Sequence, residues 1–112
     1  MNNPGMDKSQ AVIMVEIIEY ESHSVVSKTI INKTTGNVTV MSFDDGEALT
    51  EKSIPYDAFV QIIDGKAEIV IDGTSHLLNT GQSIIIPAHT SHSVKANERF
   101  KMLNTVIKSG YE

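Results

Sequence analysis

Five glycine-containing turns divide the chain at short, regular intervals, and this spacing limits the fold more than any other feature of the sequence. The pairs are Thr35-Gly36, Asp45-Gly46, Asp64-Gly65, Asp72-Gly73 and Thr80-Gly81, and each separates two apolar runs. Asp-Gly is typical of tight hairpin turns because both positions accept positive φ values. Turns spaced in this way indicate many short strands, packed in a sandwich or a closed barrel.

The choice of apolar residues supports strands over helices. The 112 residues include 14 Ile, 10 Val and 9 Thr but only 4 Leu. Side chains branched at Cβ are stiff, and they fit a pleated, half-buried surface better than a helix. We therefore predict an all-β chain whose length corresponds to one domain.

The strands predicted by this pattern begin near residue 25. The residues around Asp64-Gly65 predict a β-hairpin with arms at 59–63 and 66–71. Ser83–Ile86 is a continuous apolar run, which is typical of a strand covered on both faces. Around residues 14–20 a turn or two of helix competes with an N-terminal strand, and we expect residues 1–10 to be a flexible N-terminus before a single domain at 11–112. Further strands are expected at 25–33, 37–43, 76–78, 82–86, 91–96 and 100–107.

Cysteine content, charge and hydropathy exclude several classes of function. The chain has no cysteine, so it has no disulfide, thiolate nucleophile or cysteine-ligated metal. The net charge is -5 and Arg99 is the only arginine, whereas nucleic-acid binding needs clustered basic residues. The most apolar stretch, residues 11–15, is far too short to span a bilayer. Since the N-terminus also lacks a secretory signal pattern, we expect a cytoplasmic protein that binds neither nucleic acid nor membrane.

From Gly46 onward, the spacing of turn residues and histidine resembles that of the cupin superfamily, whose members are small antiparallel jelly-roll β-barrels. The first cupin motif runs from Gly46 to Gly65, with its ligand positions at 52, 54 and 58. The second motif falls on Gly81, Pro87, position 89, His92 and position 96. Both motifs align without a gap, and the resemblance covers residues 25–107. It implies a single jelly-roll barrel domain.

The resemblance also implies where a metal would bind, and most of the metal ligands are missing. Metal-binding cupins use two histidines and a glutamate of the first motif and the histidine of the second. Those positions here are Lys52, Ile54, Ala58 and His92, so three of the four ligands are replaced by side chains that offer a metal no lone pair. Residues 51–58 look like those of small bacterial cupins with a reduced first motif. We therefore predict a degenerate or absent metal site and no metal cofactor.

Candidates for binding a small molecule come from both motifs and from the histidines near them. His92 would point into the barrel mouth, where an imidazole can bind an anion or act as a base near neutral pH. Lys52 either points inward, where its ammonium attracts a carboxylate, or extends to solvent along the rim. Tyr56 is either a phenolic donor and gate over the pocket or a cover for an exposed edge. The candidate residues are Lys52, Ile54, Tyr56, Ala58, His76, His89 and His92.

Three alternatives to a metal-free binding pocket remain open. His76, His89 and His92 together would form a non-standard three-histidine site for a divalent metal, as in a metal-dependent oxygenase with rearranged histidine ligands. An enzyme using His92 as base and Tyr56 as acid, as some sugar-epimerase cupins suggest, requires both groups across one cavity. A structural or sensory module predicts a filled barrel with no cavity for a ligand. We assign no catalytic residue.

The prediction that we favour is a small cupin barrel with a pocket for a small anionic molecule. His89 replaces a motif glycine, and His tolerates positive φ better than most residues, so the loop need not be disrupted. The resemblance also implies a homodimer, since dimers are common in the family. Residues 25–31 are the expected edge strand for that pairing.

Overall fold

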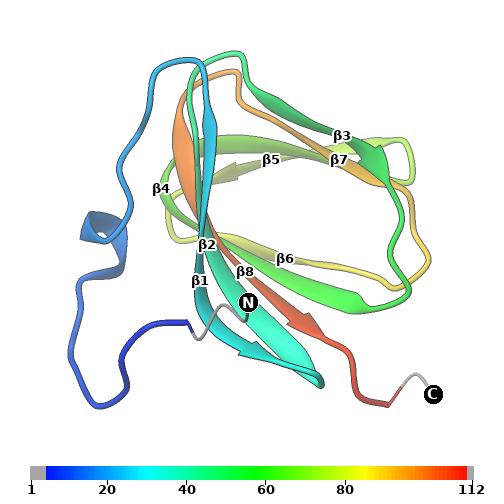
Figure 1. The fold of residues 1–112 in the computed structure, drawn as a ribbon. Coiled ribbons are helices and arrows are strands. Elements are labelled where there is room, and N and C mark those ends of the chain that lie inside the picture. The colour runs from blue at the N-terminus through cyan, green and yellow to red at the C-terminus, as the bar shows by residue number, and fades with distance from the viewer. Residues whose placement is uncertain (1–4, 111–112) are drawn as a thin grey trace.

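The structure is a computed structural model that describes residues 5–110, and nearly all of its regular elements are β-strands (Figure 1). One short 3-10 helix, η1 (Met14–Glu16), precedes the strands of this described region, so the helical alternative for the N-terminal segment is correct. All strand pairings are antiparallel, which confirms the predicted all-β jelly-roll barrel. Within residues 5–110 the strands are β1 (Val25–Lys33), β2 (Gly36–Phe43), β3 (Ala48–Lys52), β4 (Asp57–Ile71), β5 (Thr74–Asn79), β6 (Ser83–Ile86), β7 (His92–Lys95) and β8 (Phe100–Ile107).

The barrel is built from two sheets that share one long strand. Sheet A has the order β1-β2-β8-β4-β6, and sheet B has the order β5-β4-β7-β3. The first half of β4 pairs with β6 and β8, and its second half pairs with β5 and β7. Figure 1 shows the two sheets curling around a common interior, with β4 running through both.

The predicted hairpin at Asp64-Gly65 is wrong, because β4 continues through both residues. The register between β4 and β8 shifts between Ile62 and Asp64, and Gly65 has a φ of 84°. This is a β-bulge, which bends the strand so that it leaves sheet A and enters sheet B. A Cβ at Gly65 would lie 2.3 Å from the carbonyl oxygen of Arg99, so the close approach of the neighbouring chain also requires glycine.

The turn between β4 and β5, in contrast, forms as predicted. Asp72 and Gly73 have φ values of 49° and 80°, and Ile71 pairs directly with Thr74. Positive φ at both central positions matches the twist of the two flanking strands, so this Asp-Gly pair makes a tight hairpin.

Two strands differ from the sequence-based expectation. The pattern does not predict β3, because its residues are mostly exposed and only Leu49 is half-buried. In β6 the side chain of Ile85 is 61% exposed, so this strand is covered on one face and not on both. The other face of β6 is part of the outer surface of sheet A.

Inward-facing side chains of both sheets form the core. Phe43 of β2 pairs with Phe100 of β8, and their buried rings stack with centroids 4.5 Å apart. Val60 and Ile62 on the first half of β4 and Ile69 on the second half are also fully buried. Because β4 contributes to both sheets, its inward positions join the two halves of the core.

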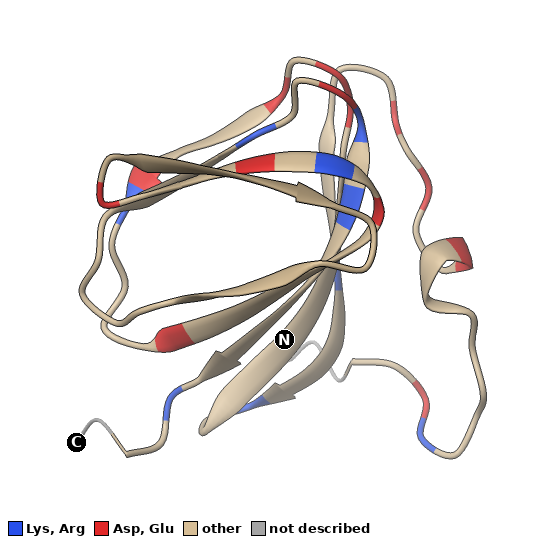
Figure 2. Cartoon of the chain, turned by 180° about the vertical axis from the view of Figure 1, so that it is seen from behind, with Lys and Arg blue, Asp and Glu red and all other residues tan. Residues whose placement is uncertain are grey.

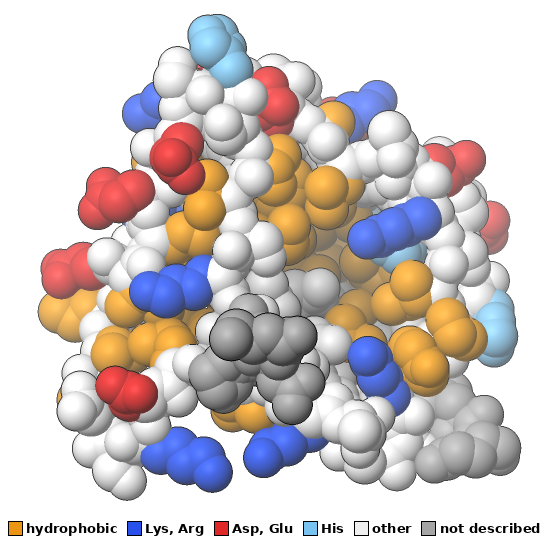
Figure 3. Space-filling model, viewed as in Figure 1, with side chains coloured by type: hydrophobic (Ala, Val, Ile, Leu, Met, Phe, Trp, Pro, Cys, Tyr) orange, Lys and Arg blue, Asp and Glu red, His pale blue; other side chains and the backbone are white. Residues whose placement is uncertain are grey.

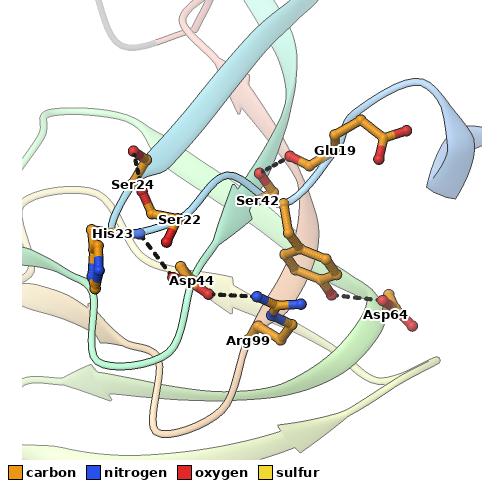
Figure 4. Close-up of polar contacts among 9 residues, drawn as sticks. Glu19, Ser22, His23, Ser24, Ser42, Asp44, Asp64 and Arg99 are labelled. Atoms are coloured by element: carbon orange, nitrogen blue, oxygen red, sulfur yellow. Dashed lines mark hydrogen bonds and ion pairs between the residues drawn. The ribbon is translucent and has the colours of Figure 1, made fainter.

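Residues 11–24, which we call the N-terminal arm, run along the outside of the barrel (Figure 1). The side chain of Ile18 is buried, and η1 contacts β4. Hydrogen bonds attach the arm to sheet A. Among them, Lys101 Nζ donates to the carbonyl of Val15 at 2.6 Å, and Ser42 Oγ donates to the carbonyl of Glu19 at 2.8 Å (Figure 4). The arm is therefore packed on the sheet up to the point where β1 begins. Residues 1–4 of the predicted flexible N-terminus lie outside the described residues.

A polar cluster fixes the end of the arm. The hydroxyl of Tyr20 donates to Asp64 Oδ2 at 2.6 Å, and the backbone N–H of His23 donates to Asp44 Oδ2 at 2.8 Å. Asp44 also forms an ion pair with Arg99, at 2.9 Å between Oδ1 and Nη2 (Figure 4). Burial and the hydrogen bond to Asp64 raise the pKa of the Tyr20 hydroxyl, so it stays a donor near neutral pH.

Charged residues are distributed over the arm, the turns and several strands. Figure 2 shows acidic and basic positions interspersed along the chain, without a strand devoted to basic residues. Within the part of the chain that the structure describes, no helix has both the length and the apolar character needed to cross a membrane.

Candidate functional site

A cavity of about 220 Å³ opens inside the barrel between the two sheets. Most of its lining is apolar, and Figure 3 shows a hollow surrounded by hydrophobic side chains on this face of the molecule. A mostly apolar pocket with a few polar groups is the usual form of a small-molecule site. The polar side chains in the lining are Thr50, Lys52, His92, Ser93 and Asn104. A cavity of this kind argues against the filled barrel expected of a purely structural module.

A β-bulge in β3 places Lys52 at this cavity. Leu49 pairs with Val94 and Lys52 pairs with His92, so three steps along β3 match two steps along β7. Without the extra residue, regular alternation would place Glu51 opposite His92 and would turn Lys52 to the outer face. The bulge therefore decides that a basic side chain, and not an acidic one, faces the cavity.

Lys52 and His92 form a cross-strand pair at the cavity. Residues directly opposite each other on antiparallel strands project from the same face of the sheet. His92 is only 6% exposed, whereas Lys52 is exposed, so the pair extends from the interior to the mouth. His92 Nδ1 lies 3.2 Å from the carbonyl oxygen of Thr90. Because a carbonyl only accepts hydrogen bonds, Nδ1 carries the proton in this contact, and Nε2 is the nitrogen left for a ligand.

Comparison with known proteins identifies the barrel. The family model described as the cupin domain matches residues 39–106. The chain belongs to the cupin family. No curated protein matches this cupin.

Several solved structures are similar to this cupin over most of its length. A conserved protein of unknown function from Streptococcus pyogenes has 32% identity and a TM-score of 0.88, over 93% of this chain and 91% of that chain. A cupin 2 conserved barrel domain protein from Leptotrichia buccalis has 36% identity and a TM-score of 0.81, over 84% of this chain and 46% of the other. A cupin superfamily protein from Desulfitobacterium hafniense has 24% identity and a TM-score of 0.86, over 96% and 98% of the two chains.

The side chains at the family's metal positions lie at the cavity but do not fit a metal. Lys52, Ile54, Ala58 and His92 all line the cavity, as the motif alignment predicts. Ile54 and Ala58 have no donor atom, and an ammonium has no lone pair, so one imidazole remains where four ligands would be needed. Among residues 5–110 no group of three or more His, Asp or Glu side chains is placed to hold a metal ion.

The structure does not bring the other three candidates to this cavity. His76 is half-buried on β5, where it lines a shallow surface groove with Ser83. His89 is exposed with a φ of 60°, which confirms that histidine is accepted at the position of the motif glycine. Its backbone N–H donates to the carbonyl of Ile54 at 2.7 Å. Tyr56 packs against the core, with Lys108 Nζ 5.8 Å from its ring centroid.

These positions weaken two of the alternatives. A three-histidine metal site needs His76, His89 and His92 together, and the described residues do not bring them into one group. The acid–base alternative needs Tyr56 and His92 across one cavity, and of these two only His92 belongs to the cavity lining.

The sequence reasoning missed three polar cavity residues, Thr50, Ser93 and Asn104, and of these Asn104 has a buried side-chain oxygen without a partner among the described residues. Asn104 lies on β8, where Phe100, Met102 and Val106 are the other inward positions and are all apolar and buried. The Asn104 Oδ1 atom is buried and has no hydrogen-bond partner within residues 5–110. An amide that interrupts an otherwise apolar face of a strand is the sequence signal that would have found it.

Proposed function

We propose that this cupin is a binding module whose cavity holds a small anionic molecule, with no resident metal. One observation carries the proposal: Lys52 and His92 are paired across β3 and β7 at the mouth of a mostly apolar cavity. Lys52 occupies a position that metal-binding cupins give to a ligand, so the side chain supplies a positive charge where relatives would hold a cation.

The pairing explains how an anion would be held. A carboxylate in contact with an ammonium is stabilised more strongly beside apolar walls than in bulk water, because fewer water molecules screen the two charges. His92 adds Nε2, which donates to a carboxylate when the ring carries a proton on both nitrogens, and the contact between Nδ1 and Thr90 fixes the ring orientation. Lys52 thus supplies the positive charge, and His92 helps to orient the carboxylate of the ligand.

The volume of the cavity limits the size of the ligand. Sites for drug-sized molecules enclose roughly 300–1,000 Å³, and this cavity has about 220 Å³. A short-chain organic acid is within this limit.

Titration calorimetry with acetate, propionate, butyrate and valerate tests the proposal. We expect at least one of these acids to bind the wild-type protein and to bind Lys52→Met about tenfold to a hundredfold more weakly, since a charge-assisted hydrogen bond is lost. Lys95→Met is the matched control, because Lys95 is an exposed lysine of the adjacent strand β7 outside the cavity lining. Equal losses in the two variants, or no binding by the wild type, would contradict the proposal.

Elemental analysis of the protein purified without added metal tests the second part of the proposal. We expect no transition metal at a stoichiometric level, because the side chains at the four family positions include a single imidazole. One tightly held metal ion per chain that is lost in His92→Ala would contradict a metal-free pocket. Elemental analysis of His76→Ala would show whether a second histidine takes part in holding that metal ion.

A further inference from the structure

The unpaired oxygen of Asn104 adds information about the ligand that Lys52 and His92 do not give. A buried polar atom without a hydrogen bond is unfavourable, and native proteins contain few of them. Asn104 lines the cavity, and its Oδ1 lacks a partner within the described residues. The terminal torsion of an Asn side chain is soft, so a modest rotation can direct this oxygen toward a donor in the cavity.

Asn104 and the Lys52–His92 pair lie on different walls of the cavity. Asn104 belongs to β8 of sheet A, where it pairs with Thr39 and Val60, while Lys52 and His92 belong to sheet B. The rest of the lining is mostly apolar, with Met41 and Met102 from sheet A, and its other polar side chains are Thr50 and Ser93 of sheet B. The cavity therefore offers a polar position on each of two walls, within a mostly apolar lining.

The chemistry of the two polar positions differs. Lys52 is a cation and recognises an anionic group. The orphan Oδ1 of Asn104 accepts hydrogen bonds only, so it recognises an O–H or N–H group. A ligand with a carboxylate alone would leave this oxygen unpaired in the complex.

We infer that the ligand is a short carboxylic acid that carries a hydroxyl group at the end opposite its carboxylate. The carboxylate binds at Lys52 and His92, the short carbon chain contacts the apolar walls, and the hydroxyl donates to Asn104 Oδ1. This inference rests on the proposed function, since it needs an anion at Lys52, and it makes Asn104 a specificity-determining residue.

Matched pairs of acids test the inference. The probes are propionate, butyrate and valerate and the same three acids with a terminal hydroxyl, each titrated into the wild-type protein. At the chain length that binds most tightly, we expect the hydroxylated acid to bind about fivefold to thirtyfold more tightly than the plain acid. The hydroxyl satisfies a buried acceptor that the plain acid leaves unpaired. Asn104→Leu should bind both members of the pair with equal affinity.

A matched control separates the cavity amide from amides elsewhere on the same sheet. Gln61 lies on β4 at a position that faces away from the cavity, so Gln61→Leu should keep the preference for the hydroxylated acid. Asn104→Leu should fold with unchanged or higher thermal stability, since it removes an unpaired acceptor. The NMR signal of the Asn104 side-chain amide gives a readout in the wild type, and it should shift with the hydroxylated acid and much less with the plain acid.

The outcomes distinguish this inference from the proposed function. If plain and hydroxylated acids bind the wild type equally and both depend on Lys52, the binding module stands and the inference is wrong. A preference for the hydroxyl that persists in Asn104→Leu would also overturn it. If no acid binds in a Lys52-dependent way, the proposed function itself fails.

Discussion

Asp44, at the loop end of β2, joins the N-terminal arm to the segment before β8 through one carboxylate. It is only 8% exposed, and it accepts hydrogen bonds from the His23 backbone N–H at 2.8 Å and from Arg99 at 2.9 Å. The His23 N–H and then the Arg99 guanidinium lower the pKa of Asp44 from 3.8 to about 2. Both contacts favour the ionised form, so the native state binds a proton here less readily than the unfolded chain does.

This difference predicts how stability depends on pH. Because the folded-state pKa lies below the unfolded one, the stabilisation is present above 3.8 and is lost as the pH falls toward about 2. We expect Asp44→Asn to be less stable than the wild type near neutral pH and to lose less stability over that acidic range. Urea unfolding across the range measures both effects, with Asp45→Asn, an exposed neighbour, as the control. Parallel pH profiles for the wild type and Asp44→Asn would contradict the role assigned to this carboxylate.

Residues of the cavity were predictable where motif spacing fixes them and not elsewhere. Positions 52, 54, 58 and 92 line the cavity because the two cupin motifs place each at a set point of the barrel. Asn104 lies outside both motifs, so spacing gave no information about it. His76 and Tyr56 are candidates by their side-chain chemistry and by their place after a turn and in a loop, and neither reveals the direction in which a side chain points.

Among the elements, β4 shows why the same dipeptide can have two structures. Asp72-Gly73 forms a tight hairpin, whereas Asp64-Gly65 sits in a continuous strand. At Gly65 the positive φ serves a bulge between two sheets, and β8 passes so close that no side chain fits. Local sequence predicts the positive φ, but only the tertiary packing of β8 decides whether the chain reverses there.

Alanine substitutions at the two glycines distinguish these structures. Gly65→Ala adds a Cβ that would lie 2.3 Å from the Arg99 carbonyl oxygen, and it also forces an L residue to a φ of 84°. We expect it to lower the free energy of unfolding by at least about 2 kcal/mol. Gly73 has a similar φ of 80°, but a Cβ at this position would meet no atom within 4 Å. Gly73→Ala should therefore lower the free energy of unfolding by only about 1 kcal/mol. Chemical denaturation measures both, and equal losses would show that the approach of β8 at Gly65 is unimportant.

The bulge in β3, like the one in β4, depends on packing against a neighbouring strand and not on local sequence. A single extra residue between Leu49 and Lys52 exchanges the faces of Glu51 and Lys52. Nothing in the polar segment 48–52 indicates that shift, because register is set by the partner strand β7 and not by local propensity. The sequence therefore supports the position of Lys52 in the motif, while the direction of its side chain depends on the structure.

At the scale of the whole molecule, the outer face of sheet A carries a row of side chains that is apolar except for Thr105. Ile85 pairs with Phe59, Phe59 with Thr105, Thr105 with Val38, and Val38 with Ile31, so the row crosses five strands in register. Paired residues project from the same face, and the row ends on β1, the edge strand predicted for dimer formation. Ile31, Phe59 and Ile85 are 50%, 39% and 61% exposed. Exposed apolar side chains gathered on one face of a sheet often mark an interaction surface.

We propose that a second copy of the chain covers this row and forms a homodimer with two-fold symmetry. Light scattering during size-exclusion chromatography should give about twice the 12.3 kDa of one chain. Ile85→Glu should shift the protein to the monomer mass, because two-fold symmetry would bury two unpaired carboxylates in the interface. Leu77→Glu is the control, since Leu77 is 60% exposed on β5 outside the row and should remain dimeric. A wild type that elutes at the mass of one chain, or a dimer that survives Ile85→Glu, would contradict this assembly.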